Sequence, residues 1–352
     1  MQPFKERGRF KIDLTMKEQA IDSPFTTIPP ADEMIIFLKQ HVGVESEPVV
    51  SIGEDVKYGH LIAKIPDEAK CGANMHSPVT GKITDITERY HPGSKKAERV
   101  IIIKTIDEKE TSVFEHLDPN LESKETLLER IKKAGVVGLG GASFPSYLKL
   151  NQKKEISTLI INAKESDPNM AADFRLMIEK PEEVTKGIQI IQQILGSQRI
   201  IFATRTSEGQ TPDLTKFLTE NGIEIHRVRP NYSIGAENLL IKEILGIEVP
   251  EGQLPPDIGV LVHNIGTAFA IYEAIYKGQP TVSRGLALYS KNFGGKNLWV
   301  RMGTPINHIF SHLEIDLDDV SRLVQGSIFM GIPVPNLHFP TLKASTAITT
   351  FP

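Results

Sequence analysis

Residues 136–150 read V-V-G-L-G-G-A-S-F-P-S-Y-L-K-L and place Gly138, Gly140 and Gly141 a few positions ahead of Lys149. Glycine adopts backbone conformations that let a loop approach an anion closely and point its N–H groups at it. The residues that follow predict a helix N-terminus, where phosphates commonly bind, and the lysine adds a positive charge. By itself the stretch predicts either this anion cradle or a tight strand–helix turn.

Three further loops have the same character, because each follows an apolar β run and combines asparagine or glycine with polar groups. They read N-A-K-E-S-D-P at residues 162–168, N-Y-S-I-G-A-E at 231–237 and H-N-I-G-T at 263–267. In open α/β sheets ligands bind at the carboxyl ends of the strands, so we expect the four loops to meet in one crevice. The alternatives are local ones: a turn with solvated charges at 162–168, and a helix cap by Thr267.

Strand and helix patterns alternate through the middle of the chain. Apolar β runs at residues 157–162, 198–203, 224–229 and 259–264 are separated by helical patterns, of which residues 181–196 are the clearest. This alternation predicts a parallel sheet with helical crossovers, a Rossmann-like layer arrangement.

Both flanks of this region carry short β segments instead. Residues 43–105 contain G-E-D-V-K-Y-G-H-L-I-A and S-P-V-T-G-K-I, separated by turn residues at the spacing of a small all-β module. The phrases are similar to those of biotinyl and lipoyl carrier domains, but no lysine stands in the expected hairpin-tip setting, so a barrel-sandwich module without a prosthetic group is expected. Beyond Pro280, short β segments and one helical stretch predict a compact module of β-grasp size.

Composition excludes several classes of function. The net charge of −4 offers no basic field for nucleic acid, and no apolar run approaches the ~20 residues of a membrane span. The N-terminus lacks the apolar core of a signal peptide. Cys71 is the single cysteine, so the chain supplies neither an intrachain disulfide nor the thiolates of an iron–sulfur cluster. Only His308 and His312 have a ligand-like spacing, without a third ligand, so no metal site is expected.

The ordered motifs resemble those of the RnfC family, a component of Rnf-type ion-translocating electron-transport complexes whose core is related to the FMN-binding, NADH-oxidising subunit of respiratory complex I. The similarity runs over residues 24–347. It includes the two β-module phrases, the glycine stretch, L-I-I-N-A-K-E-S-D-P, D-F-R-L-M, Y-S-I-G-A-E-N-L-L-I, the run from E-V-P-E-G-Q-L-P-P-D to H-N-I-G-T-A, and W-V-R-M-G-T-P.

This resemblance implies a role for each candidate residue. Gly138, Gly140, Gly141 and Lys149 would hold the phosphate of FMN. Glu165 and Asp167, the implied catalytic residues, would face the isoalloxazine and NADH together with Asn162. The remaining implied cofactor-binding residues are Tyr232, Gly235 and Glu237, which would close the site, and Asn264 and Thr267, on the ribityl side. The implied chemistry is hydride transfer from NADH to FMN, followed by one-electron steps.

The expected fold is α/β, with a Rossmann-like FMN-binding core between a barrel-sandwich hybrid module and a β-grasp (SLBB-like) module. The expected divisions are an arm (1–42), the barrel-sandwich hybrid (43–120), the FMN/NADH-binding domain (121–281), the β-grasp module (282–325) and a tail (326–352). The resemblance implies a peripheral electron-transfer subunit on the cytoplasmic side of the inner (plasma) membrane. Its expected partners are NADH and the membrane and iron–sulfur subunits of an Rnf complex, without nucleic acid and without a transmembrane segment of its own.

Departures from the family pattern keep other interpretations open. Lys164 stands where a small or acidic residue is usual, and the chain stops at Pro352, where the family continues into a ferredoxin-like cluster domain. The iron–sulfur clusters that carry electrons onward would then belong to partners, or the chain is a shortened relative. An alternative is a degenerate, non-catalytic RnfC-like assembly scaffold without cofactor, so enzymatic activity depends on an intact FMN site. A soluble ligand-binding module acting through residues 283–312 is a weaker alternative.

Overall fold

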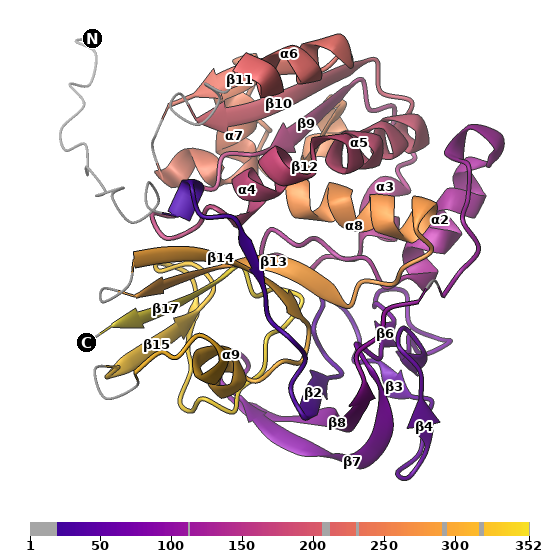
Figure 1. Ribbon diagram of the computed structural model, residues 1–352. Helices are drawn as coiled ribbons and strands as arrows, with labels where there is room; N and C mark the ends of the chain where they lie inside the picture. Colours follow the sequence, from indigo (N-terminus) through magenta and orange to yellow (C-terminus); the bar gives the residue numbers. More distant parts are fainter. Residues whose placement is uncertain are drawn as a thin grey trace.

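The protein is described by a computed structural model over residues 20–111, 113–205, 212–229, 232–290, 294–316 and 320–351. Four β-sheets form three neighbouring parts (Figure 1). A parallel sheet with its helices lies at the top of the view, an all-β part drawn in indigo and purple lies below it, and a mixed sheet drawn in orange and yellow completes the molecule. The mixed α/β class expected from the sequence is therefore confirmed.

The central sheet contains four parallel strands in the order β11-β10-β9-β12. Their bounds are β9 (Thr158–Asn162), β10 (Arg199–Arg205), β11 (Glu224–Val228) and β12 (Val260–Asn264). In this register Asn162 stands directly beside Asn264, so the carboxyl ends of β9 and β12 are level. Two of the sequence-predicted loops therefore start side by side.

Helices cover both faces of this sheet, because its strands bury side chains alternately on each side. The helices are α2 (Lys124–Lys133), α3 (Ser146–Leu150), α4 (Ala172–Glu179), α5 (Pro181–Leu195), α6 (Pro212–Glu220), α7 (Glu237–Leu245) and α8 (Ile265–Tyr276). Leu159 and Ile161 pack toward α5 and α8, whereas Ile160 joins the opposite core with α7. The helical periods expected for residues 124–134, 181–196, 213–221, 238–245 and 268–276 are confirmed.

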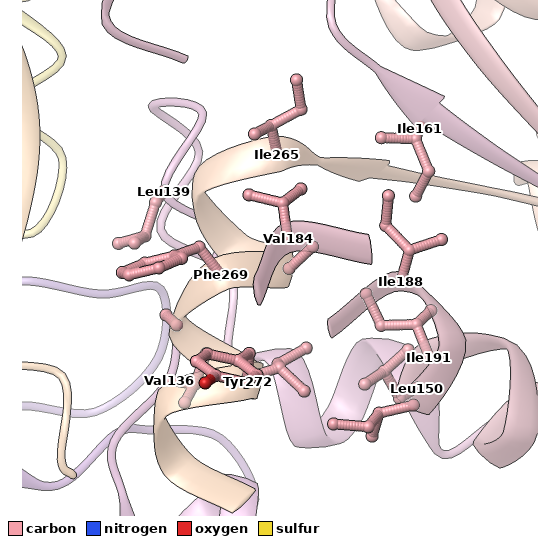
Figure 2. Close-up of a cluster of buried hydrophobic side chains, with 14 of the residues drawn as sticks. Val136, Leu139, Leu150, Ile161, Val184, Ile188, Ile191, Ile265, Phe269 and Tyr272 are labelled. Atoms are coloured by element: carbon pink, nitrogen blue, oxygen red, sulfur yellow. The ribbon is translucent and has the colours of Figure 1, made fainter. Parts of the chain in front are cut away.

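Figure 2 shows the larger core, in which Val184 and Ile188 of α5 lie between Ile161 of β9 and residues of α8. Leu139 of the glycine stretch is 3% exposed and lies beside Phe269 of α8. Burying this side chain fixes one end of the glycine loop in the core.

The N-terminal all-β part consists of two small antiparallel sheets over one core. One sheet contains β2 (Glu33–Phe37), β8 (Lys96–Asp107), β7 (Thr80–His91) and β4 (Asp55–Val56); the other contains β3 (Glu47–Pro48), β5 (Leu61–Lys64) and β6 (Met75–His76). Met34 and Ile36 face this shared core, whereas Ile35 and Phe37 face the core of the third part. Strand β2 therefore joins two parts of the molecule.

The third part is a six-stranded mixed sheet with α9 (Ile306–His312). Its order is β1 (Phe25–Thr27), β14 (Gly294–Arg301), β13 (Ser283–Ser290), β17 (Ala347–Phe351), β15 (Arg322–Gln325) and β16 (Ile332–Pro333). Strands β1 and β17 come from the predicted arm and tail. Local patterns missed them because β1 is three residues long and β17 is surrounded by irregular, proline-rich sequence.

None of the helices within the described ranges is both long and apolar enough to cross a lipid bilayer.

Candidate functional site

A cavity of about 1210 Å³ opens where the ends of β9 and β12 meet the glycine loop and the third sheet. Its volume exceeds the roughly 300–1,000 Å³ that is usual for a single small-molecule ligand. The twelve residues singled out from the sequence all line it: Gly138, Gly140, Gly141, Lys149, Asn162, Glu165, Asp167, Tyr232, Gly235, Glu237, Asn264 and Thr267.

The glycine loop is a narrow turn whose two ends are hydrogen-bonded to each other. Gly138 N–H donates to the Phe144 carbonyl at 2.8 Å, and Ser143 N–H donates to the Gly138 carbonyl at 3.0 Å. Gly141 has a φ of +106°, a conformation that side chains rarely tolerate. In the described part of the chain, the N–H groups of Gly140, Gly141 and Ala142 have no hydrogen-bond acceptor. The tip of the loop thus presents three successive donors at the cavity wall.

Two buried side chains hold this loop in place through Leu139. Its N–H donates to Thr267 Oγ1 at 2.9 Å, and its carbonyl accepts from Arg284 Nη2 at 2.9 Å. Arg284 is 4% exposed and also donates to the Lys343 carbonyl. Burial lowers the pKa of Arg284 to about 10, although Asp173 and Glu165 oppose the shift, so the guanidinium stays charged at neutral pH. Arg284 lines the cavity and was missed from the sequence, since nothing local distinguishes it within its β segment.

Asn264 joins the glycine loop to the start of α8. Its Oδ1 accepts from Thr267 N–H at 3.2 Å, capping the helix, and its Nδ2 donates to Asp173. A Cβ atom on Gly140 would stand 3.2 Å from Asn264 Cβ, which is tighter than ordinary contact. Glycine is therefore needed here for close approach. The cap that sequence reasoning kept as an alternative is present, with Asn264 rather than Thr267 as the capping side chain.

Asn162 connects the end of β9 to η3 (Tyr232–Gly235). Its Nδ2 donates to the Gly235 carbonyl at 3.3 Å, and its Oδ1 accepts from Lys164 N–H at 3.1 Å. A Cβ atom on Gly235 would overlap Ser166 Oγ. Lys164 itself is 1% exposed, donates from Nζ to Ser166 Oγ at 2.8 Å and is absent from the cavity lining.

Glu165 lines the cavity and also caps a helix. Its Oε1 accepts from Asp173 N–H at 3.0 Å and its Oε2 from Phe174 N–H at 2.8 Å, at the start of α4. Glu165 has a φ of +37°, so this arrangement is held at a strained position. Helix α4 was not recognised from its periodicity; only its D-F-R-L-M phrase pointed to it.

Asp167 ties the end of β9 to the loop between β15 and β16. The side chain is nearly buried, and its Oδ1 accepts from Ser327 Oγ at 2.7 Å and from Ile328 N–H at 3.1 Å. Close by, the rings of Tyr232 and Phe329 meet edge to face with centroids 4.7 Å apart. The role of Asp167 toward a ligand stays a prediction.

The remaining polar groups near the glycine loop give the cavity a positive and donor-rich side. Lys149 Nζ lies 3.2 Å from Glu237 Oε1, and both are partly exposed. His263 is 4% exposed, and burial, together with the charge of Lys149, holds its pKa well below the usual range, so the imidazole is neutral. Within the described ranges, His263 Nε2 and the hydroxyls of Ser143 and Ser146 are buried without a hydrogen-bond partner. A ligand with several acceptor and donor atoms would complete them.

The described residues contain no group of three His, Cys, Asp or Glu side chains arranged to hold a metal ion.

Two family models match the chain. Residues 12–108 match the RnfC barrel sandwich hybrid domain, and residues 131–273 match the Nuo51 FMN-binding domain. The second match contains most of the cavity lining, including the glycine loop and the ends of β9 and β12. The predicted barrel-sandwich hybrid and FMN-binding regions are thus both confirmed as family matches.

Solved structures share the fold at low identity. An NAD+-reducing NiFe-hydrogenase in the H2-reduced state superposes with a TM-score of 0.55 and 18% identity, over 66% of this chain and 48% of that one. The same type of enzyme in the air-oxidised state has a TM-score of 0.56 and 19% identity. The chain spans about half the length of these solved chains.

Curated relatives match over nearly the whole chain. The RnfC-type component of the proton-translocating ferredoxin:NAD(+) oxidoreductase complex of Clostridium ljungdahlii is 33% identical over 344 residues, which is 94% of this chain and 73% of the relative. The corresponding component of the ion-translocating oxidoreductase complex of Rhodobacter capsulatus is 32% identical, over 99% of this chain and 68% of the relative. The chain therefore belongs to the RnfC family of ion-translocating oxidoreductase complexes.

Proposed function

We propose that this chain is a peripheral electron-transfer subunit of an Rnf-type membrane complex that binds FMN in the cavity and oxidises or regenerates NADH there. The observation that carries the proposal is the loop tip at Gly140, Gly141 and Ala142. Its N–H groups, which lack acceptors within the described ranges, stand beside two level strand ends, inside the region that matches an FMN-binding domain. We likewise assign the central sheet to a Rossmann-like arrangement and the third sheet to a β-grasp (SLBB-like) module, within the divisions expected from the sequence.

The residues present fit the phosphate of FMN. A phosphate needs several hydrogen-bond donors and positive charge, and the loop tip, Lys149 and the hydroxyls of Ser143 and Ser146 supply both. The neutral His263 and the Nδ2 group of Asn264 are suited to the hydroxyl-bearing chain of the cofactor. We place the isoalloxazine ring toward Asn162 and Glu165, at the end of β9.

FMN, when bound, supplies the chemistry that accepts a hydride from NADH and passes its two electrons on singly. The protein's own part is to hold, orient and screen. Glu165 and Asp167 each accept backbone N–H groups in the cavity wall, so their negative charges stand at fixed positions. Fixed charges and dipoles in a partly buried site act without reorganisation.

The electrons leave through partner subunits. Cys71 is the only cysteine in the chain, so the redox centres that receive electrons belong to iron–sulfur partners of the complex. We place the protein on the cytoplasmic side of the membrane, docked on membrane-embedded partners.

The visible absorption spectrum of the purified chain tests this proposal. We expect a yellow protein with about one FMN per chain, whose flavin absorbance is lost when NADH is added without oxygen. Riboflavin is the matched ligand, since it lacks only the phosphate; we expect it to bind about tenfold or more weakly, because charge-assisted hydrogen bonds are lost. A colourless chain that takes up neither flavin would instead support the non-catalytic scaffold.

A further inference from the structure

The loop that joins β15 to β16 is a compact turn organised around Ser327. The Ser327 hydroxyl accepts from the N–H groups of Phe329 and Met330 at 3.1 Å each, while it donates to Asp167. Gly331 N–H donates to the Ser327 carbonyl at 2.7 Å, and a Cβ atom at Gly331 would overlap that carbonyl. These bonds set the positions of Phe329 and Met330 before any ligand arrives.

The same loop is fastened to the opposite wall of the cavity. Asp167 accepts from both Ser327 and Ile328, which lie 160 and 161 residues further along the chain. The ring of Phe329 packs against Tyr232 of η3. The third sheet therefore contributes a preorganised piece to a cavity whose other walls belong to the central sheet.

This loop exposes two large apolar side chains at the edge of the cavity. Phe329 is 50% exposed and Met330 79% exposed, and Met330, Gly331 and Ile332 all line the cavity. A cavity-lining residue that is four-fifths exposed stands where the cavity opens to solvent. Two exposed apolar residues on a rigid turn beside Tyr232 offer a surface for a flat aromatic ring.

We propose that the turn Gly326–Ile332 is the base-binding wall of the cavity, and that it receives the adenine ring of the nicotinamide dinucleotide. This inference rests on the proposed function. The nicotinamide end of the substrate has to reach the flavin beside Asn162 and Glu165, inside the cavity. The adenosine end then extends toward the opening, where Phe329 and Met330 stand.

Asp167 is a positioning residue in this arrangement. It touches Ser327 and Ile328, and Ser327 in turn orients the two apolar residues. The wall therefore depends on a carboxylate that makes no contact with the base itself.

Equilibrium titration of the FMN-loaded protein with ADP-ribose, nicotinamide mononucleotide and NADH tests the assignment. Stacking of a nucleobase on an apolar or aromatic side chain accounts for roughly a tenfold change in affinity. We expect Phe329→Ala and Met330→Ala each to weaken ADP-ribose and NADH binding by about that factor, with unchanged affinity for nicotinamide mononucleotide and unchanged FMN content. Leu121→Ala is the matched control, because Leu121 is 84% exposed and lies outside the cavity lining.

Each other outcome counts against the inference. If the loaded protein binds NADH and both variants keep the affinity for ADP-ribose, the wall is elsewhere while the proposed function stands. Weaker binding of nicotinamide mononucleotide in the variants would place the nicotinamide, not the adenine, on this loop. A wild-type protein that takes up FMN but no dinucleotide would overturn both the inference and the NADH part of the proposed function.

Discussion

The Leu139 N–H donates a hydrogen bond of 2.9 Å to Thr267 Oγ1, so the first turn of α8 holds the glycine loop by its one buried residue. Leu139 is the only non-glycine position between Gly138 and Gly141. Its side chain, N–H and carbonyl are all engaged, the last by Arg284. The following three residues are left to face the cavity, which explains how a flexible sequence forms a defined cradle.

Replacing Thr267 by Val tests this anchor. The substitution keeps the volume but leaves the Leu139 N–H without its acceptor, which costs about 1–3 kcal/mol when the group is buried. We expect a lower free energy of unfolding in urea and weaker FMN binding. Thr267→Ser keeps the hydroxyl and should retain more of both quantities; equal losses in the two variants would contradict the anchoring role.

Gly235→Ala should disturb the end of β9. The added methyl group overlaps Ser166 Oγ, which in turn accepts from Lys164. Overpacking of this kind costs about 1–3 kcal/mol, so we expect a lower melting temperature. In the double variant Gly235→Ala with Ser166→Gly the overlap is removed, and calorimetry should show most of the loss recovered. No recovery would show that Gly235 is required for another reason.

Lys149 and Glu237 should have opposite effects on FMN. Lys149→Met removes a cation from the phosphate region, and we expect FMN to bind about tenfold more weakly while riboflavin binding is unchanged. Glu237→Gln removes the carboxylate that now pairs with Lys149 at 3.2 Å. Because a partly exposed pair contributes about 0–1 kcal/mol, FMN affinity should rise by no more than about fivefold. Parallel losses for FMN and riboflavin in Lys149→Met would rule out a phosphate contact.

Lys343 should make stability depend on pH. Its buried ammonium donates to the carbonyls of Asn74 and Gly135 at 3.0 and 2.7 Å, and burial lowers its pKa to about 7. Between this value and the ordinary lysine pKa of about 10.4, the unfolded chain binds a proton that the folded protein does not. Stability from this group therefore rises with pH above 7, by up to about 1.4 kcal/mol per pH unit, and is constant below it.

The comparison that isolates this effect is Lys343→Met, measured by urea unfolding at several pH values from 7 to 9. The variant lacks the titrating group, so its free energy of unfolding should rise less steeply with pH than that of the wild type. Parallel curves for the two proteins would mean that Lys343 titrates alike in the folded and unfolded states.

Asp167→Ala should release the β15–β16 loop without emptying the flavin site. The Ser327 hydroxyl and the Ile328 N–H lose their shared acceptor, so the amides of residues 327–331 should exchange hydrogen faster. ADP-ribose affinity should fall while FMN content is kept. Asp67→Ala, which changes an exposed carboxylate paired with Lys64, is the control. Loss of FMN in Asp167→Ala would indicate a direct role at the flavin instead.

Much of the central region could be predicted from the sequence, because local patterns determine it. The period of residues 181–196 indicates α5, and an apolar run that ends in asparagine indicates β9. Parallel strands present their carboxyl ends at one edge, so Asn162 and Asn264 had to be neighbours once both strands were recognised. Glycine at Gly141 was equally readable as a loop that needs positive φ.

Tertiary structure alone decided the partners of those residues. Arg284 reaches Leu139 across 145 positions, and Asp167 reaches Ser327 across 160, so neither contact leaves a trace in local spacing. Strands β1 and β17 are likewise too short or too irregular to be recognised until a neighbouring strand offers them hydrogen bonds. The sequence by itself determined which loops carry the cavity's polar groups. Long-range packing determined which of those groups are engaged by the protein and which, as at Gly140 and Ser146, are left for a ligand.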